Sequence, residues 1–69
     1  MIVINFNKKL YNLKIIQSVA KLYKDVADFI FTEKKNYIIL TIKNINKEVK
    51  DIIKDEFCNY VLSLTKNKK

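Results

Sequence analysis

The side chains that could do acid–base or nucleophilic chemistry in this chain are few. Two carboxylate pairs occur, Glu48 with Asp51 and Asp55 with Glu56, and the single thiol is Cys58. The chain has no histidine and no glycine, so a histidine general base, a Cys–His nucleophile and a glycine-rich phosphate loop are excluded. One cysteine without histidine also makes a zinc site improbable. We therefore expect a protein that is not an enzyme and holds no cofactor.

Glu56 and Cys58 are the two of these side chains whose positions are informative. On a helix, Glu56 falls inside the apolar face near Ile52 and Tyr60, where an unpaired buried carboxylate would be costly. It is expected to curl out to water or to pair with a lysine, and the alternative is a specific contact at an interface. Cys58 falls on the opposite, polar side, and nothing in the sequence provides the surroundings of a reactive thiolate.

The composition suits binding better than catalysis. The formal net charge is +7 and every basic residue is lysine, which fits an acidic protein or a polyanion. Arginine, the usual residue for bidentate phosphate and guanine contacts, is absent. Of the four tyrosines and four phenylalanines, most fall on expected core faces, and Tyr37 is the exception. A small basic nucleic-acid-binding module is therefore the alternative to protein or peptide binding.

Three segments have the alternation or the β-branched composition that is typical of strands. Residues 2–7 and 27–33 alternate, whereas residues 37–43 are apolar on both faces, which predicts the central strand of the sheet. Residues 34–36 form the turn between the last two strands. In a chain that lacks glycine, Asn36 is the residue of this turn best able to take a left-handed conformation.

Two further segments have the periodicity of amphipathic helices. The first is predicted at residues 13–24 with Asn12 as its N-cap, and the second at residues 47–65 with Asn44 or Asn46 as its cap. The apolar face of the first comprises Leu13, Ile16, Val19, Ala20 and Tyr23, widened by Ile15 and Leu22. The face of the second comprises Val49, Ile53, Phe57, Tyr60, Val61 and Leu64, with Ile52 at its edge.

The order strand, helix, strand, strand, helix predicts an α+β fold. We expect a three-stranded sheet in the order 1-3-2 with both helices on one face, which resembles a ferredoxin-like half lacking its last strand. Residues 1–65 are expected to form a single domain, followed by a basic frayed tail at residues 66–69.

This fold would leave two surfaces for partners. The outer edge of the first strand would display unpaired backbone donors and acceptors, and the helix-free face of the sheet would be too apolar to stay uncovered. The expected peptide-binding edge comprises Ile2, Val3, Ile4, Asn5 and Phe6. The expected partner interface comprises Val3, Ile30, Tyr37, Ile39, Ile15, Leu22 and Glu56.

Two short motifs suggest a family. The entry to the first helix has a Leu-Tyr-x-Leu pattern followed by spaced apolar residues, and the second helix has a Glu-Phe-x-Asn pattern. The residues that carry these motifs are Leu10, Tyr11, Asn12, Leu13, Ile16, Ala20 and Tyr23, then Glu56, Phe57, Cys58 and Asn59. Over about residues 2–64, the chain resembles the small D proteins of the His-Xaa-Ser peptide-modification systems (HxsD). It departs after Asn59, where the family tends to continue with an acidic helix containing glutamine and arginine.

The resemblance implies a non-enzymatic accessory to a radical-SAM peptide maturase, encoded beside a ribosomally made precursor peptide. The iron–sulfur clusters and S-adenosylmethionine would belong to the partner enzyme. The leader of the precursor could add as an extra strand beside residues 2–6, and nearby lysines would favour an acidic leader.

Two other interpretations stay open, the nucleic-acid-binding module and a homodimer that pairs the edges of its first strands. A chain of 69 residues has a thin stability margin and cannot form an internal disulfide with one cysteine, so association with itself or a partner is favoured. The sequence shows no targeting signal and no apolar run long enough to cross a bilayer. We therefore expect a cytoplasmic protein without a membrane association.

Overall fold

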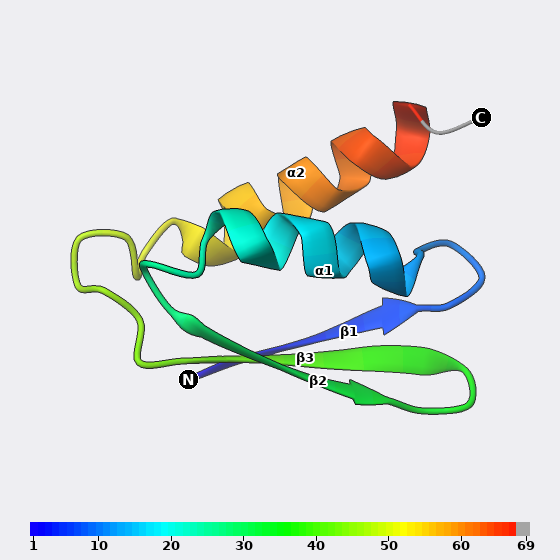
Figure 1. Cartoon of the computed structure of the whole chain (residues 1–69), viewed down its shortest axis with the longest axis horizontal. Helices are drawn as coiled ribbons and strands as arrows, with labels where there is room; N and C mark the ends of the chain where they lie inside the picture. The colour runs from blue at the N-terminus through cyan, green and yellow to red at the C-terminus, as the bar shows by residue number, and fades with distance from the viewer. Residues whose placement is uncertain (68–69) are drawn as a thin grey trace.

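The computed structural model describes residues 1–67 and places two helices over one face of a three-stranded sheet (Figure 1). The sheet has the order β1-β3-β2, and both pairs of neighbouring strands are antiparallel. The predicted α+β fold, with its open sheet and strand order 1-3-2, is confirmed. The elements are β1 (Ile2–Asn7), α1 (Leu13–Leu22), β2 (Asp28–Glu33), β3 (Tyr37–Lys43) and α2 (Ile53–Asn67).

The central strand β3 supplies the middle of the core. Ile38, Leu40 and Ile42 point toward the helices and are buried, and the residues between them face the other way. Leu40 lies opposite Ile4 of β1 and Phe31 of β2, so an apolar row crosses the whole sheet beneath the helices. The buried core comprises Ile4, Phe6, Ile16, Val19, Ala20, Ala27, Ile38, Leu40, Ile42, Ile53, Phe57 and Val61.

The first helix begins where the sequence predicts and ends two residues earlier. The Oδ1 atom of Asn12 accepts a 2.7 Å hydrogen bond from the N–H of Lys14, which confirms Asn12 as the N-cap. The helix ends at Leu22 because the chain turns toward β2 there. In that turn the N–H of Val26 donates to the C=O of Tyr23 over 3.0 Å.

The prediction that Asn36 takes a left-handed conformation is wrong. Within residues 1–67, Asn44 rather than Asn36 has a positive φ, of 50°. The β2–β3 turn closes without such a residue, through a 2.8 Å bond from the N–H of Lys34 to the C=O of Tyr37. Asn44 follows the end of β3, and its side-chain amide donates a 2.7 Å bond to Asp28 at the start of β2. That bond joins the end of β3 to the start of β2. Strand β2 begins at Asp28, one residue later than predicted.

The second helix begins six residues later than predicted because residues 47–52 form turns instead. The predicted cap, Asn44 or Asn46, is therefore wrong, because both residues precede these turns and not α2. Asn46 instead begins the turns: its Oδ1 atom accepts from the N–H of Glu48 over 2.8 Å and its C=O accepts from the N–H of Val49 over 3.1 Å. The helix itself has 15 residues and is about 22 Å long, shorter than the sequence suggests.

Burial along α2 differs from the predicted apolar face at two positions. Phe57 is fully buried, with its ring 5.7 Å from Tyr23 and 5.3 Å from Phe29. Tyr60, predicted to be in the core, is exposed, whereas Cys58, predicted on the polar side, is half-buried against the core. Apolar residues lie on both sides of Phe57 around α2. The sequence periodicity alone therefore does not determine which side of the helix packs against the core.

The predicted tail at residues 66–69 is partly helical. Lys66 and Asn67 belong to the last turn of α2, where the positive charge of a lysine is favourable beside the unpaired carbonyl groups of a helix end. Lys68 and Lys69 lie outside the described residues.

We predict that Phe57→Ala lowers the free energy of unfolding by about 3–5 kcal/mol, because it removes a fully buried ring and leaves a cavity. A domain of this size has a total stability of only about 3–10 kcal/mol, so much of the protein should unfold. Urea denaturation followed by circular dichroism measures the change.

The matched control is Tyr60→Ala on the same helix, which should lower the free energy of unfolding by about 1 kcal/mol or less because this ring is exposed. Equal losses for the two variants would contradict the observed orientation of α2.

Candidate functional site

The outer edge of β1 has no neighbouring strand within residues 1–67. In an antiparallel pair, the backbone groups of successive residues point alternately toward the partner strand and away from it. The N–H of Lys8 donates to the C=O of Asn36 over 3.0 Å and continues the β1–β3 ladder. The even-numbered residues of β1 therefore bond to β3, and the backbone groups of Val3 and Asn5 point outward.

Within the predicted peptide-binding edge, residues 2–6, only Val3 and Asn5 direct their backbone groups outward. Ile2, Ile4 and Phe6 use their backbone groups to pair with β3, and the side chains of Ile4 and Phe6 lie in the core. Asn7 closes the far end, because its C=O accepts from the N–H of Tyr11 over 2.9 Å. The free backbone of the edge is therefore short.

The sheet face opposite the helices carries an apolar strip, which we define as Val3, Ile30, Tyr37 and Ile39. Val3, Ile30 and Tyr37 are 54%, 45% and 48% exposed, and Ile39 is half-buried. Val3 and Ile30 flank Thr41 of β3 in register, so the strip crosses all three strands. These residues lie where the sequence predicted, on the uncovered face.

The other predicted interface residues lie elsewhere. Leu22 of α1 is 61% exposed, Ile15 is half-buried, and Glu56 is exposed in the first turn of α2. Both helices cover the opposite side of the sheet from the apolar strip (Figure 1). The structure therefore does not bring the seven predicted interface residues together into one surface.

Glu56 forms no ion pair within residues 1–67, and its negative charge affects the pKa of Tyr23. Partial burial raises the pKa of Tyr23, and the nearby negative charge of Glu56, followed by the effect of Tyr60, raises it further. The Tyr23 phenol is therefore neutral at neutral pH. Within residues 1–67 the ion pair that forms joins Lys8 and Glu33, at 2.7 Å.

The surroundings of Cys58 disfavour the thiolate. Burial raises the pKa of the thiol; Lys54 acts in the opposite direction, and Asp55 adds to the increase. The sulfur is therefore protonated and poorly nucleophilic at neutral pH.

The carboxylate pairs are spread over the surface. Glu48 and Asp51 are exposed in the turns before α2, and Asp55 and Glu56 are exposed in its first turn. Within the described part of the chain, no group of three or more histidine, cysteine, aspartate or glutamate side chains is placed to hold a metal ion. No helix among residues 1–67 is both long and apolar enough to cross a bilayer.

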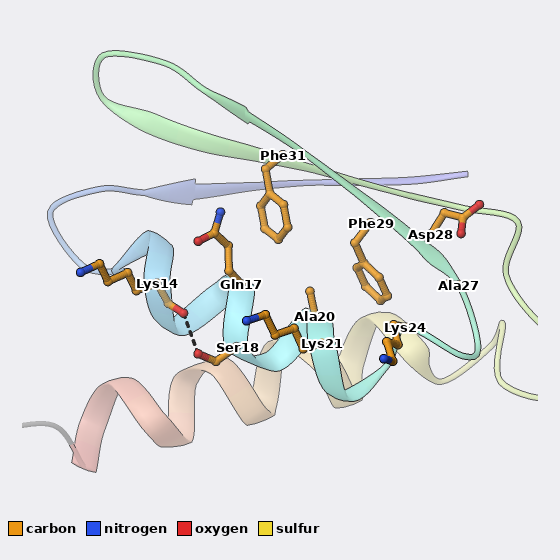
Figure 2. A pocket seen from close by; sticks show the side chains of 10 residues that line it. All are labelled: Lys14, Gln17, Ser18, Ala20, Lys21, Lys24, Ala27, Asp28, Phe29 and Phe31. Carbon is orange, nitrogen blue, oxygen red and sulfur yellow. Dashed lines mark hydrogen bonds between the residues drawn. The ribbon is translucent and has the colours of Figure 1, made fainter.

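A groove that the sequence did not predict lies at the second open edge of the sheet. Figure 2 shows it between α1 and β2, with Phe29 and Phe31 on one wall and lysines along the other. Its volume is about 640 Å³. Two signals could have found it: the spacing of Lys14, Lys21 and Lys24 along one side of the first helix, and the edge position that the order 1-3-2 gives to β2 as well as to β1.

Comparisons with protein-family models, with curated proteins and with solved structures find no match for this chain. The resemblance to the His-Xaa-Ser D proteins therefore rests on the motif residues. Several of these residues build the core: Ile16, Ala20 and Phe57 are buried, and Tyr11 packs edge-on against Phe6 at 5.1 Å. These residues therefore contribute to the packing of the fold, and they do not form an exposed surface for a partner.

We predict that native Cys58 reacts with iodoacetamide more slowly at neutral pH than a cysteine in an unstructured peptide does. Burial shields the sulfur and raises its pKa, and the thiolate is the reactive form. The rate should climb as the pH rises above the ordinary thiol range, and mass spectrometry of timed samples follows it. Unfolding in urea is the control and should restore the peptide rate. Equal rates for native protein and peptide at neutral pH would contradict the prediction.

Proposed function

We propose that this chain is a non-catalytic adaptor that binds a peptide or protein partner during the biosynthesis of ribosomally made, post-translationally modified peptides. One observation supports this proposal most strongly: at Val3, the free edge of β1 and the apolar strip coincide. The backbone groups of Val3 point outward from β1, and its side chain is 54% exposed on the uncovered sheet face. One partner segment can therefore use backbone hydrogen bonds and apolar contact together.

Binding would proceed by strand addition. An extended segment beside β1 would exchange hydrogen bonds with the backbone of Val3 and Asn5, and these bonds would provide affinity independent of sequence. Its alternate side chains would extend the apolar strip across a fourth strand. This is the position that the last strand takes in a complete ferredoxin-like fold, so the partner would complete the sheet.

The proposed partners are a radical-SAM peptide maturase and the leader of its precursor peptide. This assignment is supported by the motif resemblance, and the net charge of +7 favours an acidic leader. The iron–sulfur and S-adenosylmethionine chemistry would lie in the maturase, and this chain would hold or orient the peptide.

The alternative function is a small basic nucleic-acid-binding module. It is favoured by the lysine content, but stacking of successive bases needs aromatic side chains on one surface. The two exposed aromatic residues, Tyr37 and Tyr60, lie on β3 and α2, which face opposite sides of the molecule. The other six aromatic side chains pack in the core or against it.

We predict that Asn5→Pro abolishes partner capture and leaves the protein folded. Proline lacks the N–H that points outward at this position, and it is tolerated at an edge strand on the side that faces solvent. The assay is co-expression of a tagged chain with the genes that neighbour its own, capture at low and at high salt, and mass spectrometry of the retained molecules. Circular dichroism checks the fold of each variant.

Two variants serve as controls. Asn5→Thr keeps the outward N–H and should retain the partner, whereas Ile4→Pro removes a bond to β3 and a core side chain and should unfold the protein. Retention of the maturase or precursor by folded Asn5→Pro would refute edge binding. Recovery of nucleic acid alone, lost at high salt, would favour the alternative function. Sedimentation that depends on protein concentration, without any partner, would instead indicate a homodimer.

A further inference from the structure

We propose that the groove between α1 and β2 binds an acidic peptide segment, which pairs with the free edge of β2 and buries an apolar side chain against Phe29 and Phe31. This site goes beyond the proposed function, because it lies at the opposite edge of the sheet from Val3 and Asn5. It needs no assumption about the maturase.

The direction of the backbone groups on β2 follows from the hairpin. The N–H of Lys34 donates to the C=O of Tyr37 over 2.8 Å and begins the β2–β3 ladder. By the antiparallel alternation, the even-numbered residues of β2 bond to β3, and the backbone groups of Phe29 and Phe31 point outward. The same two residues also turn their side chains toward α1 (Figure 2). A strand added here would therefore place every second side chain in the groove.

The apolar wall of the groove is shaped to contact an apolar side chain of the peptide. Phe29 stacks on Phe57 with ring centroids 5.3 Å apart and an interplanar angle of 21°, which fixes its ring in place. Phe29 and Phe31 are only half-buried, and the small side chains of Ala20 and Ala27 also line the groove. The volume of about 640 Å³ is within the range of roughly 300–1,000 Å³ that ligand sites occupy.

The other wall is positively charged. Lys14 and Lys21 of α1 and Lys24, two residues after its end, are exposed and line the groove, and none forms an ion pair with another residue in 1–67 (Figure 2). The one carboxylate among the residues that line the groove, Asp28, belongs to the strand positions that face away from the helices, and it accepts a hydrogen bond from Asn44. The charge offered to a ligand is therefore cationic, which selects for carboxylates.

The spacing of the lysines matches an extended peptide. Lys14 lies near the start of α1 and Lys24 lies two residues after its end, and the two lysines mark the two ends of the groove (Figure 2). The helical residues from Lys14 to Leu22 alone rise by about 12 Å. Two strand residues four positions apart are separated by about 14 Å and point to the same side. A segment with acidic residues four apart and an apolar residue midway would place both carboxylates by the lysines and the apolar group by Phe29 and Phe31.

The test uses the full chain and a fluorescein-labelled peptide, Ser-Glu-Thr-Leu-Thr-Glu-Ser, in a fluorescence polarisation titration. We expect saturable binding that is lost when both glutamates are replaced by lysine and weakened when the leucine is replaced by serine. Equal binding of all three peptides, or of none, would overturn the proposal.

The variant Lys21→Glu with Lys24→Glu should weaken binding by about tenfold or more, because two exposed attractions become repulsions. The matched control, Lys47→Glu with Lys54→Glu, changes the net charge equally at lysines outside the groove and should have little effect. Equal weakening by the two double variants would show binding by net charge alone and would overturn the site.

Strand pairing is tested with two further peptides, N-methylated on alternate sets of residues. The set whose N–H groups face β2 should abolish binding, and the other set should not; equal effects of both sets would overturn strand addition. Asn5→Pro, which tests the β1 edge, should leave this binding unchanged, so failure of one site is distinguishable from failure of the other. Binding of a single-stranded oligonucleotide to the same lysines, with no binding of the peptide, would replace the proposal with nucleic-acid recognition.

Discussion

The burial of one face of β3 beneath both helices is the interaction on which the rest of the structure depends. Ile38, Leu40 and Ile42 are almost inaccessible to solvent, and β3 is the strand that both other strands pair with. Within residues 1–67, this sheet is the one layer against which the buried side chains of α1 and α2 pack. A chain of this length has a small margin of stability, so loss of this layer leaves little to hold the strands together.

The small number of strands and helices also leaves the sheet open. Three strands and two helices cover one face, so the opposite face and two strand edges remain available within the described residues. The two edges differ in chemistry. The β1 edge lies beside the apolar strip at Val3, whereas the β2 edge lies beside a groove with Phe31 on one wall and lysines on the other. The partners proposed for the two edges would therefore differ in character, and each would supply the hydrogen bonds that an open edge lacks.

Two titratable side chains that pack against the core, Tyr23 and Cys58, are favoured in their neutral forms. Burial raises the pKa of Tyr23 and of Cys58, and every buried side chain of residues 1–66 is apolar. Both shifts favour the neutral, protonated form of the side chain. The binding proposed for the two edges would therefore depend on backbone groups and apolar contact, with the exposed lysines favouring acidic partners.

The sequence by itself determined the elements, their order and the strand arrangement, because strand and helix periodicities, the Asn12 cap and the apolar β3 all act over short distances. Tertiary structure decided which flank of α2 turns inward, so Cys58 is half-buried and Tyr60 exposed. It also decided that alternate residues of β1 form its free edge, and that lysines of α1 meet Phe31 across a groove. These features depend on register and on the packing of distant segments, which local patterns do not contain.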